Sequence, residues 1–513
     1  MKYRATLLHW GRSLLTVAAV LFHGSMWAQG NFVYTNDDQP SNTVSAFSVG
    51  SDGTLTAIAG SPFSTNGVGF RGGPFATNRI GIAVMDNFLF VSNTGSDNVS
   101  VFNINPRTGG LTPVAGSPFA TGSSSGDLGI AVSTTPDGRY LVATNTGSNN
   151  ITVFSLASNG ILSRIVGSPF PTLKSPDGIR ISPDGKFLAV AETAFPPSEE
   201  TTNQVENFSI AQNGTLTSLG AFAGGGTGSL TDVDIDCSSS FLYGGEANDT
   251  NTIVDAYSIA SNGSLTAISG SPFLAGPGDN SNVVLLSPDD KTLFVSNQFS
   301  DTITAFSVAS NGSLSQLAGS PFPMRGVVAF PVGMATSGDG SFLFVADNNQ
   351  VGNLKSSISM FNVAKDGTIA EVSGSPFSTG QSSGLHSLTA YPPKSCVLPV
   401  GIQIKPPASA PVVINPQSKG KIPVAILSTV TFNAVTQVSP NSLTFGHTGN
   451  EVSLAFCDTR GEDVNGDGLV DLVCYFNTRQ TEFAAWDTTA VLKGQTITGR
   501  KIRASESIRT VPK

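Results

Sequence analysis

Charged residues, histidines and cysteines are all scarce in this chain of 513 residues. Charged side chains make up 12% of it, about half of the usual share, and the formal net charge is −9. No cluster of lysine and arginine is present that would neutralise phosphates, so we expect no nucleic-acid partner. Glycine is abundant instead, with 56 residues, and with serine and threonine it is typical of short strands and tight turns.

Long apolar runs are missing after the first thirty residues, so no membrane span is expected in the mature chain. The N-terminus is basic, continues through the apolar stretch 14–22 and reaches the small residue Ala28. This order predicts a secretory signal peptide over 1–28, with an uncleaved anchor as the alternative. We therefore expect a secreted, periplasmic or cell-surface protein.

Only four cysteines occur, and three of them lie in the last quarter of the chain. In an oxidising compartment we expect a disulfide there. Cys457 with Cys474 would brace the acidic loop between them, but Cys396 could pair with either, and the sequence does not decide the connectivity. Cys237 is interpreted as a buried free thiol.

Several motifs of common enzymes are missing as well. The sequence has no His-Glu-x-x-His pair and no phosphate-binding glycine loop. Its two Gly-x-Ser-x-Gly strings, at 122–126 and 380–384, lie in stretches rich in glycine and serine, which are typical of turns rather than of a catalytic elbow. Conventional hydrolase and nucleotide chemistry is therefore disfavoured.

An internal repeat dominates what is present. The tetrapeptide Gly-Ser-Pro-Phe occurs six times, and a degenerate seventh copy, Gly220-Ala221-Phe222, lies at the expected place. Successive copies are 49 to 56 residues apart. The intact copies begin at Gly60, Gly116, Gly167, Gly270, Gly319 and Gly374.

Each repeat contains four segments with strand character, joined by Asp-Gly or Asn-Gly hairpin turns. Such units stack radially, because one four-stranded sheet cannot bury both its faces alone. The chain opens at the second strand of a unit, at Phe32, and the missing first strand returns at 385–391, so the circle closes within one blade. The predicted fold is all-β: a seven-bladed β-propeller over 31–392, followed by a small β-sandwich-like domain over 397–513.

The loops at one rim of the predicted propeller are rich in asparagine and aspartate, as at 36–38, 93–98 and 145–150. Turn formation alone would explain these residues. Seven copies around an axis would also form a polar funnel, suited to a small-molecule, glycan or protein ligand.

Three short motifs carry a family resemblance: Phe-Val-Tyr-Thr-Asn at 32–36, Phe-Val-Ser-Asn at 294–297 and Ser-Pro-Asp-Gly at 182–185. With them, about seven tenths of the chain resembles the YVTN-type and lactonase-like seven-bladed propellers. That family groups 6-phosphogluconolactonases and related lactone-processing enzymes with exported propellers, so the resemblance implies a fold more than an activity.

The resemblance also implies catalytic candidates. Lactonase members carry Gly-Pro-Arg-His at the start of an inner strand and a glutamate at the end of the next, whereas this chain has 175–178 as Ser-Pro-Asp-Gly and then Glu192. Arg180 shares a strand face with position 178 and is a partial substitute. His386 is interpreted either as a general base on an inner strand or as a packed side chain. A lactonase would use Arg180, Glu192 and His386.

The C-terminal domain has one sharp motif, an acidic stretch at 463–471. Its spacing predicts a structural calcium site, because hard oxygen ligands recur at positions 1, 3, 5 and 9 and a backbone carbonyl can add another. Position 12 is Cys474 rather than a carboxylate, and a strand follows, so the loop is similar to those of FG-GAP repeats; an acidic turn without a metal is the alternative. The expected ligands are Asp463, Asn465, Asp467, Leu469 and Asp471.

Two functions follow from these observations. The favoured one is a secreted binding or scaffold protein whose propeller funnel holds a ligand. The alternative is an exported lactonase that hydrolyses a sugar or related lactone. A shared pocket around Arg180, Glu192 and His386 would favour the enzyme, and their separation on different blades would argue against it.

Overall fold

The structure is a computed structural model of the chain. It describes residues 30–69, 81–123, 129–193, 203–226, 228–247, 251–277, 281–325, 330–349, 355–382, 384–407, 411–429, 432–497 and 500–511. The predicted signal peptide, residues 1–28, lies outside this part of the chain. No helix in the described ranges is long and apolar enough to cross a membrane.

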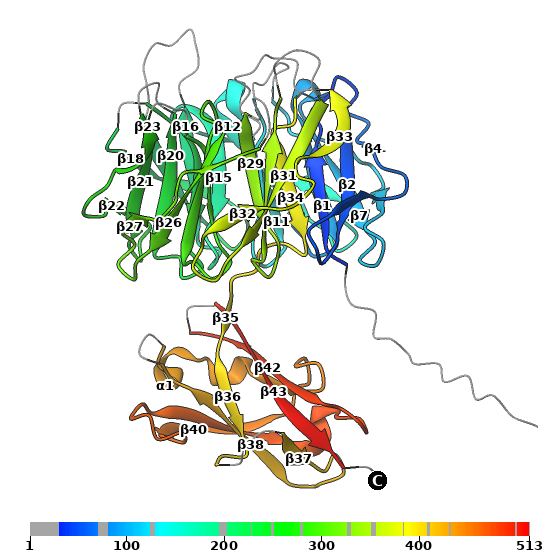
Figure 1. Ribbon diagram of the computed structural model, residues 1–513, viewed down its shortest axis with the longest axis vertical. Coiled ribbons are helices and arrows are strands. Elements are labelled where there is room, and N and C mark those ends of the chain that lie inside the picture. Colours follow the sequence, from blue (N-terminus) through cyan, green and yellow to red (C-terminus); the bar gives the residue numbers. More distant parts are fainter. Residues whose placement is uncertain are drawn as a thin grey trace, which may run out of the picture.

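Seven antiparallel sheets stand around a common axis and form the upper body in Figure 1. Blades 2 to 4 follow one another along the chain. Blade 2 consists of β5 (Ile82–Met85), β6 (Phe88–Asn93), β7 (Asn98–Ile104), β8 (Leu111–Pro113) and β9 (Phe119–Ala120); blade 3 of β10 (Val132–Thr134), β11 (Tyr140–Asn145), β12 (Asn150–Leu156), β13 (Leu162–Arg164) and β14 (Phe170–Pro171); blade 4 of β15 (Ser175–Ile181), β16 (Phe187–Thr193), β17 (Gln204–Ile210) and β18 (Leu216–Ala223).

Blades 5 to 7 continue the same order from the inner to the outer strand. Blade 5 consists of β19 (Ser229–Ile235), β20 (Phe241–Ala247), β21 (Asn251–Ile259), β22 (Leu265–Ala267) and β23 (Phe273–Pro277); blade 6 of β24 (Ser281–Leu286), β25 (Thr292–Asn297), β26 (Thr302–Val308), β27 (Leu314–Gln316) and β28 (Phe322–Pro323); blade 7 of β29 (Pro331–Thr336), β30 (Phe342–Asp347), β31 (Lys355–Val363), β32 (Ile369–Glu371) and β33 (Phe377–Ser382).

Blade 1 is built from both ends of the propeller sequence. It contains β1 (Phe32–Asn36), β2 (Thr43–Val49), β3 (Leu55–Ala57) and β4 (Phe63–Ser64), and its inner strand is β34 (Ser387–Tyr391). Strand β1 pairs antiparallel with β34 from Phe32 opposite Tyr391 to Asn36 opposite Ser387. The predicted closure is therefore confirmed, and the propeller has no open seam between its first and last blades.

The Gly-Ser-Pro-Phe repeat marks a break in the outer strand of six blades. In blade 1 the Ser61 hydroxyl oxygen accepts the backbone N–H of Ala46 at 2.9 Å, which satisfies a third-strand donor at the point where the outer strand is interrupted. The same contact recurs in the other five copies, as Ser117 with Val101, Ser168 with Val153, Ser271 with Ala256, Ser320 with Ala305 and Ser375 with Met360. Blade 4 has the degenerate copy, and its outer strand β18 runs on without the break.

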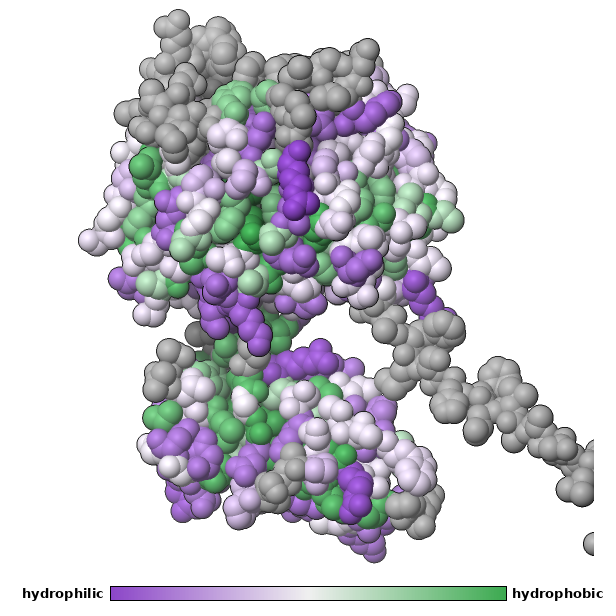
Figure 2. All heavy atoms as spheres, in the orientation of Figure 1, coloured by the Kyte–Doolittle hydropathy of each residue, from purple (hydrophilic) through white to green (hydrophobic). Residues whose placement is uncertain are grey.

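The apolar cores lie between neighbouring blades. One cluster combines Tyr34 and Val44 of blade 1 with Leu89 and Val91 of blade 2, and Phe63 from the first Gly-Ser-Pro-Phe packs against it. The repeated phenylalanine thus contributes to the contact between blades. Figure 2 shows polar and apolar side chains interspersed over the visible outer surface of the blades.

The C-terminal domain is a sandwich of two sheets below the propeller (Figure 1). One sheet contains β35 (Val397–Pro399), β43 (Lys501–Thr510), β42 (Thr489–Gln495), β39 (Thr444–Gly446) and β37 (Val412–Ile414). The other contains β36 (Gly401–Ile404), β38 (Lys421–Leu427), β41 (Asp471–Asn477) and β40 (Leu454–Glu462), and a short helix α1 (Ala434–Gln437) follows β38. Both sheets contribute to one core that includes Ile426, Phe445, Phe476 and Leu492.

Two disulfides are present, and one of them corrects the sequence prediction. Cys457 and Cys474 lie opposite each other on β40 and β41 and are bonded, as one of the open pairings proposed. Cys237 is not a free thiol: it is bonded to Cys396 in the segment between β34 and β35. This pair could not be predicted from the sequence, because its members are 159 positions apart and only the propeller fold brings them together.

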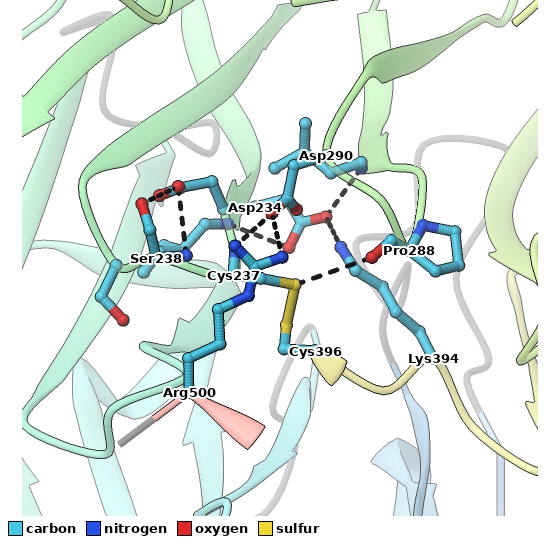
Figure 3. Close-up of a disulfide and its surroundings, with 12 residues drawn as sticks. Asp234, Cys237, Ser238, Pro288, Asp290, Lys394, Cys396 and Arg500 are labelled. Carbon is cyan, nitrogen blue, oxygen red and sulfur yellow. Dashed lines mark hydrogen bonds and ion pairs between the residues drawn. A yellow bond between two sulfur atoms is a disulfide. The ribbon is translucent and has the colours of Figure 1, made fainter. Parts of the chain in front are cut away.

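The Cys237–Cys396 disulfide belongs to a junction that ties the second domain to the lower face of the propeller (Figure 3). Lys394 of the linker forms an ion pair with Asp234 of β19, with Nζ 3.3 Å from Oδ2. Arg500, at the start of β43, places a guanidinium nitrogen 3.4 Å from a carboxylate oxygen of Asp290. A covalent bond and two ion pairs thus fix this attachment.

Removal of the junction disulfide should loosen the linker. The Cys237→Ser/Cys396→Ser variant loses a cross-link over 159 residues, for which the chain-entropy relation gives about 5 kcal/mol of stability. We expect tryptic cleavage after Lys394 to become faster, measured by the appearance of the two fragments over time.

The matched control is Cys457→Ser/Cys474→Ser, whose cross-link spans 17 residues and contributes about 3 kcal/mol by the same relation. It should leave cleavage after Lys394 at the wild-type rate. Equal cleavage rates in both double variants would show that the junction does not depend on its disulfide.

Candidate functional site

Every blade ends its second strand with a buried polar residue at the face away from the C-terminal domain, which is the upper face in Figure 1. All seven side chains are at most 1% exposed. We call this set the upper ring: Asn36, Asn93, Asn145, Glu192, Glu246, Asn297 and Asp347.

In blades 2, 3 and 6 the upper-ring residue is an asparagine that connects neighbouring blades. In blade 2, Nδ2 of Asn93 donates to Oγ of Ser100 at 2.8 Å, and that hydroxyl donates to the carbonyl of Thr65 in blade 1 at 2.7 Å. The same relay runs from Asn145 through Thr152 to the carbonyl of Thr121, and from Asn297 through Thr304 to that of Ala275. The hydroxyls satisfy buried backbone carbonyls of the preceding blade, and the asparagines bind the hydroxyls, so the role of each pair is to hold turns and blades together.

Blade 4 replaces the neutral relay by two carboxyl groups. Glu192 takes the asparagine position on β16, and Glu206 on β17 takes the position of the hydroxyl. In the neutral blades a hydroxyl donates to a backbone carbonyl, whereas here the carboxylates accept hydrogen bonds from backbone N–H groups. Oε2 of Glu206 accepts the N–H of Leu173 at 2.9 Å, and Oε1 of Glu192 accepts that of Lys174 at 3.0 Å. Glu192 also accepts a hydrogen bond from Gln204.

Blade 5 makes the same replacement with Glu246 and Asp255. Oδ1 of Asp255 accepts the N–H of Gly225 at 2.8 Å, and Oε2 of Glu246 accepts Nδ2 of Asn203 at 2.6 Å. Asn203 belongs to the chain just before β17 of blade 4, so it connects blade 4 to the acidic residues of blade 5. Four buried carboxyl groups therefore occupy the upper end of two adjacent blades, and we call them the acidic quartet: Glu192, Glu206, Glu246 and Asp255.

Burial governs the protonation of the acidic quartet. Loss of hydration, together with a hydrogen bond shared with Glu206, raises the pKa of Glu192 to about 7. Burial also raises the pKa of Asp255, against the opposing effect of its hydrogen bonds to Gly225 and Asn203. Near neutral pH a large fraction of Glu192 is therefore protonated, and this carboxyl can then donate a hydrogen bond.

Arg180, the first candidate catalytic residue, lies on β15 but at the other end of the strand from Glu192. It pairs across the sheet with Ala189, whereas Glu192 lies three residues farther along β16, which corresponds to about 10 Å. The Nε atom of Arg180 lies 3.0 Å from Oδ1 of Asp234, the residue that also binds Lys394 of the junction. Arg180 is thus part of the lower side of the propeller.

His386 lies at the upper face in blade 1, three blades from Glu192 in the circular order. Its Nδ1 atom is 3.1 Å from Oδ2 of Asp38, and its Nε2 atom is 3.0 Å from Nδ2 of Asn348 in blade 7. The ring is 3% exposed, so both nitrogens have buried partners. His386 joins blades 7 and 1, and the geometry does not bring it together with Arg180 and Glu192.

Sequence reasoning missed three members of the acidic quartet, namely Glu206, Glu246 and Asp255. A signal was available: when the blades are aligned on the ends of their second strands, acids appear where blades 2, 3 and 6 have Asn, Ser or Thr. Only the strand register shows that these positions face each other across each blade.

The predicted calcium loop connects β40 to β41 and contains two glycines with positive φ, Gly466 and Gly468. The Asp463 carboxylate accepts the N–H groups of Gly466 at 2.8 Å and Gly468 at 2.9 Å. Asp471 is buried and accepts the N–H of Ser428 at 2.7 Å. Among the described residues, no three His, Cys, Asp or Glu side chains are gathered as ready metal ligands.

Comparison with known proteins decides the family. The model described as "Lactonase, 7-bladed beta-propeller" matches residues 23–171, 122–230 and 250–382, which together exceed half of the chain. The chain belongs to this lactonase propeller family. No match was found among curated proteins.

Solved structures agree with the family fold. A putative 6-phosphogluconolactonase from Bacteroides fragilis is 19% identical with a TM-score of 0.54, and the match covers 71% of this chain and 99% of that one. The periplasmic gluconolactonase of Pseudomonas aeruginosa is 17% identical with a TM-score of 0.53, over 70% and 98% of the two chains. At these identities the likeness to each protein shows a shared propeller fold alone.

The raised pKa of Glu192 predicts a pH dependence of stability. Its protonated form is favoured in the folded state, so the contribution is fully present below about pH 4.5 and is lost as the pH rises through about 7. Relative to Glu192→Gln, the wild type should lose up to about 3 kcal/mol of unfolding free energy between pH 5 and 8. Urea unfolding at several pH values measures this difference.

Glu462→Gln, at an exposed carboxylate of the second domain, is the control for this comparison. Its stability should follow that of the wild type across the same pH range. A Glu192→Gln variant whose stability also runs parallel to the wild type would contradict the raised pKa of Glu192.

Proposed function

We propose that this protein is an exported lactonase-family propeller that binds a polar ligand at its upper face, beside blades 4 and 5. The acidic quartet carries this proposal. Blades 2, 3 and 6 show that a neutral asparagine–hydroxyl pair suffices to join blades. Four buried carboxyl groups at the corresponding places cost desolvation energy that the neutral pairs avoid, so a role beyond packing accounts for them.

The chemistry of the acidic quartet favours a ligand rich in hydrogen-bond donors. Carboxylates accept hydrogen bonds from sugar hydroxyls or amino groups, and a protonated Glu192 can donate one in return. The upper face is also the face opposite the second domain, so a ligand can approach it without displacing that domain (Figure 1). Two disulfides fit an oxidising compartment outside the cytoplasm, in line with the expected signal peptide.

Lactone hydrolysis is the second candidate, and one observation favours it. Glu192, whose pKa is raised to about 7, can act as a general base or a general acid at neutral pH, which ring opening of a lactone requires. Of the three candidate catalytic residues, Glu192 is the one that keeps a catalytic role in this second hypothesis. Arg180 is engaged with Asp234, and His386 with Asp38 and Asn348, so their roles in it are structural.

One panel of measurements separates the two functions. Binding of mono- and oligosaccharides to the mature chain is measured by calorimetry. Hydrolysis is measured with sugar and aliphatic lactones as substrates. Binding should weaken about tenfold or more in Glu192→Gln and in Glu246→Gln, because each loses a charged hydrogen-bond acceptor. Asp347→Asn, a carboxyl-to-amide change at the upper ring of blade 7, is the matched control and should stay within about twofold.

Hydrolysis above the buffer rate that disappears in Glu192→Gln would identify the protein as a lactonase. Saccharide binding without turnover would establish the binding function. A protein that shows no binding and no turnover would contradict a site at the acidic quartet. Equal losses in Asp347→Asn would contradict it as well.

We further propose that the loop at 463–471 binds calcium as a structural ion. Its donors are all oxygen atoms, as calcium prefers, and the two glycines allow the tight loop path. The ligands would be the side chains of Asp463, Asn465, Asp467 and Asp471 and the carbonyl of Leu469. Calcium would neutralise the repulsion among three carboxylates, which the loop offsets with backbone N–H groups and with the side-chain amide of Asn465.

Calcium should stabilise the loop of the mature protein. An excess of about tenfold over the dissociation constant corresponds to about 1.4 kcal/mol. We expect slower amide hydrogen exchange at 464–469 in calcium than in chelator, and no such change in Asp463→Asn/Asp467→Asn. Magnesium, which demands tighter octahedral geometry, is the control ion. Exchange that is identical with calcium and with chelator would contradict the calcium site.

A further inference from the structure

A large aromatic side chain stands in solvent at the pole of the second domain farthest from the propeller. Trp486 is 78% exposed, although tryptophan normally buries most of its surface. It precedes β42 and donates its backbone N–H to Oγ1 of Thr510 at 2.8 Å. Thr510 ends β43, and Figure 1 shows that this end of the strand points away from the propeller.

The backbone at Trp486 has a conformation that bulky residues avoid. Its φ is +77°, and the N–H of Asp487 bonds to the carbonyl of Ala484 at 3.3 Å, so Trp486 is the third residue of a four-residue turn. Turns with positive φ at this place usually have glycine there. A tryptophan costs folding free energy in that position, and such strain is concentrated at functional sites.

The turn is held by side chains rather than left loose. Oδ2 of Asp487 accepts the N–H of Ala484 at 2.7 Å and lies 2.9 Å from Nδ1 of His447. Beside the turn is a hollow of about 390 Å³, lined by Trp486, Asp487, Thr488, Ile508, Arg509, Thr510 and Val511. The site therefore combines an exposed aromatic side chain, on a hydrogen-bonded turn, with hydroxyl, carboxylate and guanidinium groups.

A row of cations leads away from the hollow along β43. Arg509, Arg503 and Lys501 are all exposed and alternate onto the same face of the strand, and Lys493 lies opposite Arg503 on β42. Burial, followed by the nearby charge of Arg503, lowers the pKa of Lys493. Facing cations destabilise a strand pair, so this row is unusual in a protein with a net charge of −9.

We propose that this pole binds an acidic polysaccharide, with a pyranose ring seated against Trp486 and the carboxylates of following sugars along the row from Arg509 to Lys501. The flat aromatic face matches the C–H face of a pyranose, and the polar groups of the hollow match its hydroxyls. The cations match a repeating negative charge. This site is independent of the upper face, so the protein would have a ligand site at each end.

The mature chain provides its own probe for this site. The sequence has three tryptophans, and Trp10 and Trp27 lie in the signal peptide, so Trp486 alone remains. Titration of the mature protein with an oligogalacturonate should change the tryptophan emission in a saturable way. Because exposed charges are screened within about 3 Å at 1 M salt, the affinity should fall about tenfold or more at that concentration. Uncharged cello-oligosaccharide of equal length should bind more weakly.

Two variants separate binding from folding. Trp486→Gly restores the residue that the turn prefers, so its thermal transition should be unchanged or higher while oligogalacturonate binding, followed by calorimetry, is lost. Arg503→Ser/Lys501→Ser should keep the emission of Trp486 and weaken binding about tenfold. Phe456→Ala, at another exposed aromatic residue of the same domain, is the matched control and should bind like the wild type.

Three outcomes would overturn the proposal. The first is no emission change and no heat with oligogalacturonate. The second is equal affinity for the charged and uncharged oligosaccharides, which would remove the cation row from the site. The third is equally tight binding of polyglutamate, which would show that any polyanion suffices and that no pyranose ring is recognised.

Discussion

The antiparallel pairing of β1 with β34 is the contact on which the rest of this structure depends. It joins the first and last strands of the propeller sequence inside one blade, so that the circle of blades has no open seam. Closure fixes all seven blades around one axis and defines two distinct faces. It also places the end of β34 at the lower face, which determines where the linker leaves and why Lys394, Cys396 and Arg500 meet residues of blades 5 and 6.

At the upper face, buried backbone groups need hydrogen-bond partners at seven equivalent places, because each second strand ends beside backbone groups of a neighbouring blade. Three blades solve this problem with a neutral asparagine and a hydroxyl that donates to a carbonyl of the preceding blade. Blades 4 and 5 solve it with carboxyl pairs whose desolvation raises the pKa of Glu192 and Asp255. The repeat allows a direct comparison of equivalent positions. The neutral pairs show which side chains suffice to join blades, and the carboxyl pairs of blades 4 and 5 differ from them.

The second domain extends the molecule from the lower face, and the junction joins it by a disulfide and two ion pairs rather than by the linker alone. The upper face and the strained turn at Trp486 therefore lie at opposite ends of one chain (Figure 1). The proposed site for a polar ligand and the proposed site for a polysaccharide would thus lie at opposite ends of the molecule. The two sites share no residues, so each can be removed without the other.

The sequence by itself determined the repeat, the blade number, the closure and the β character of both domains, because hydrophobic alternation and turn residues are local properties that recur in each unit. It singled out the acidic loop at 463–471 as a local motif, and Glu192 through the family resemblance alone. It could not identify the Cys237–Cys396 pair, the separation of Arg180 from Glu192, or the partners of His386. These depend on strand register and on contacts between residues that are far apart in the chain, and only the tertiary structure decides which side chains meet there.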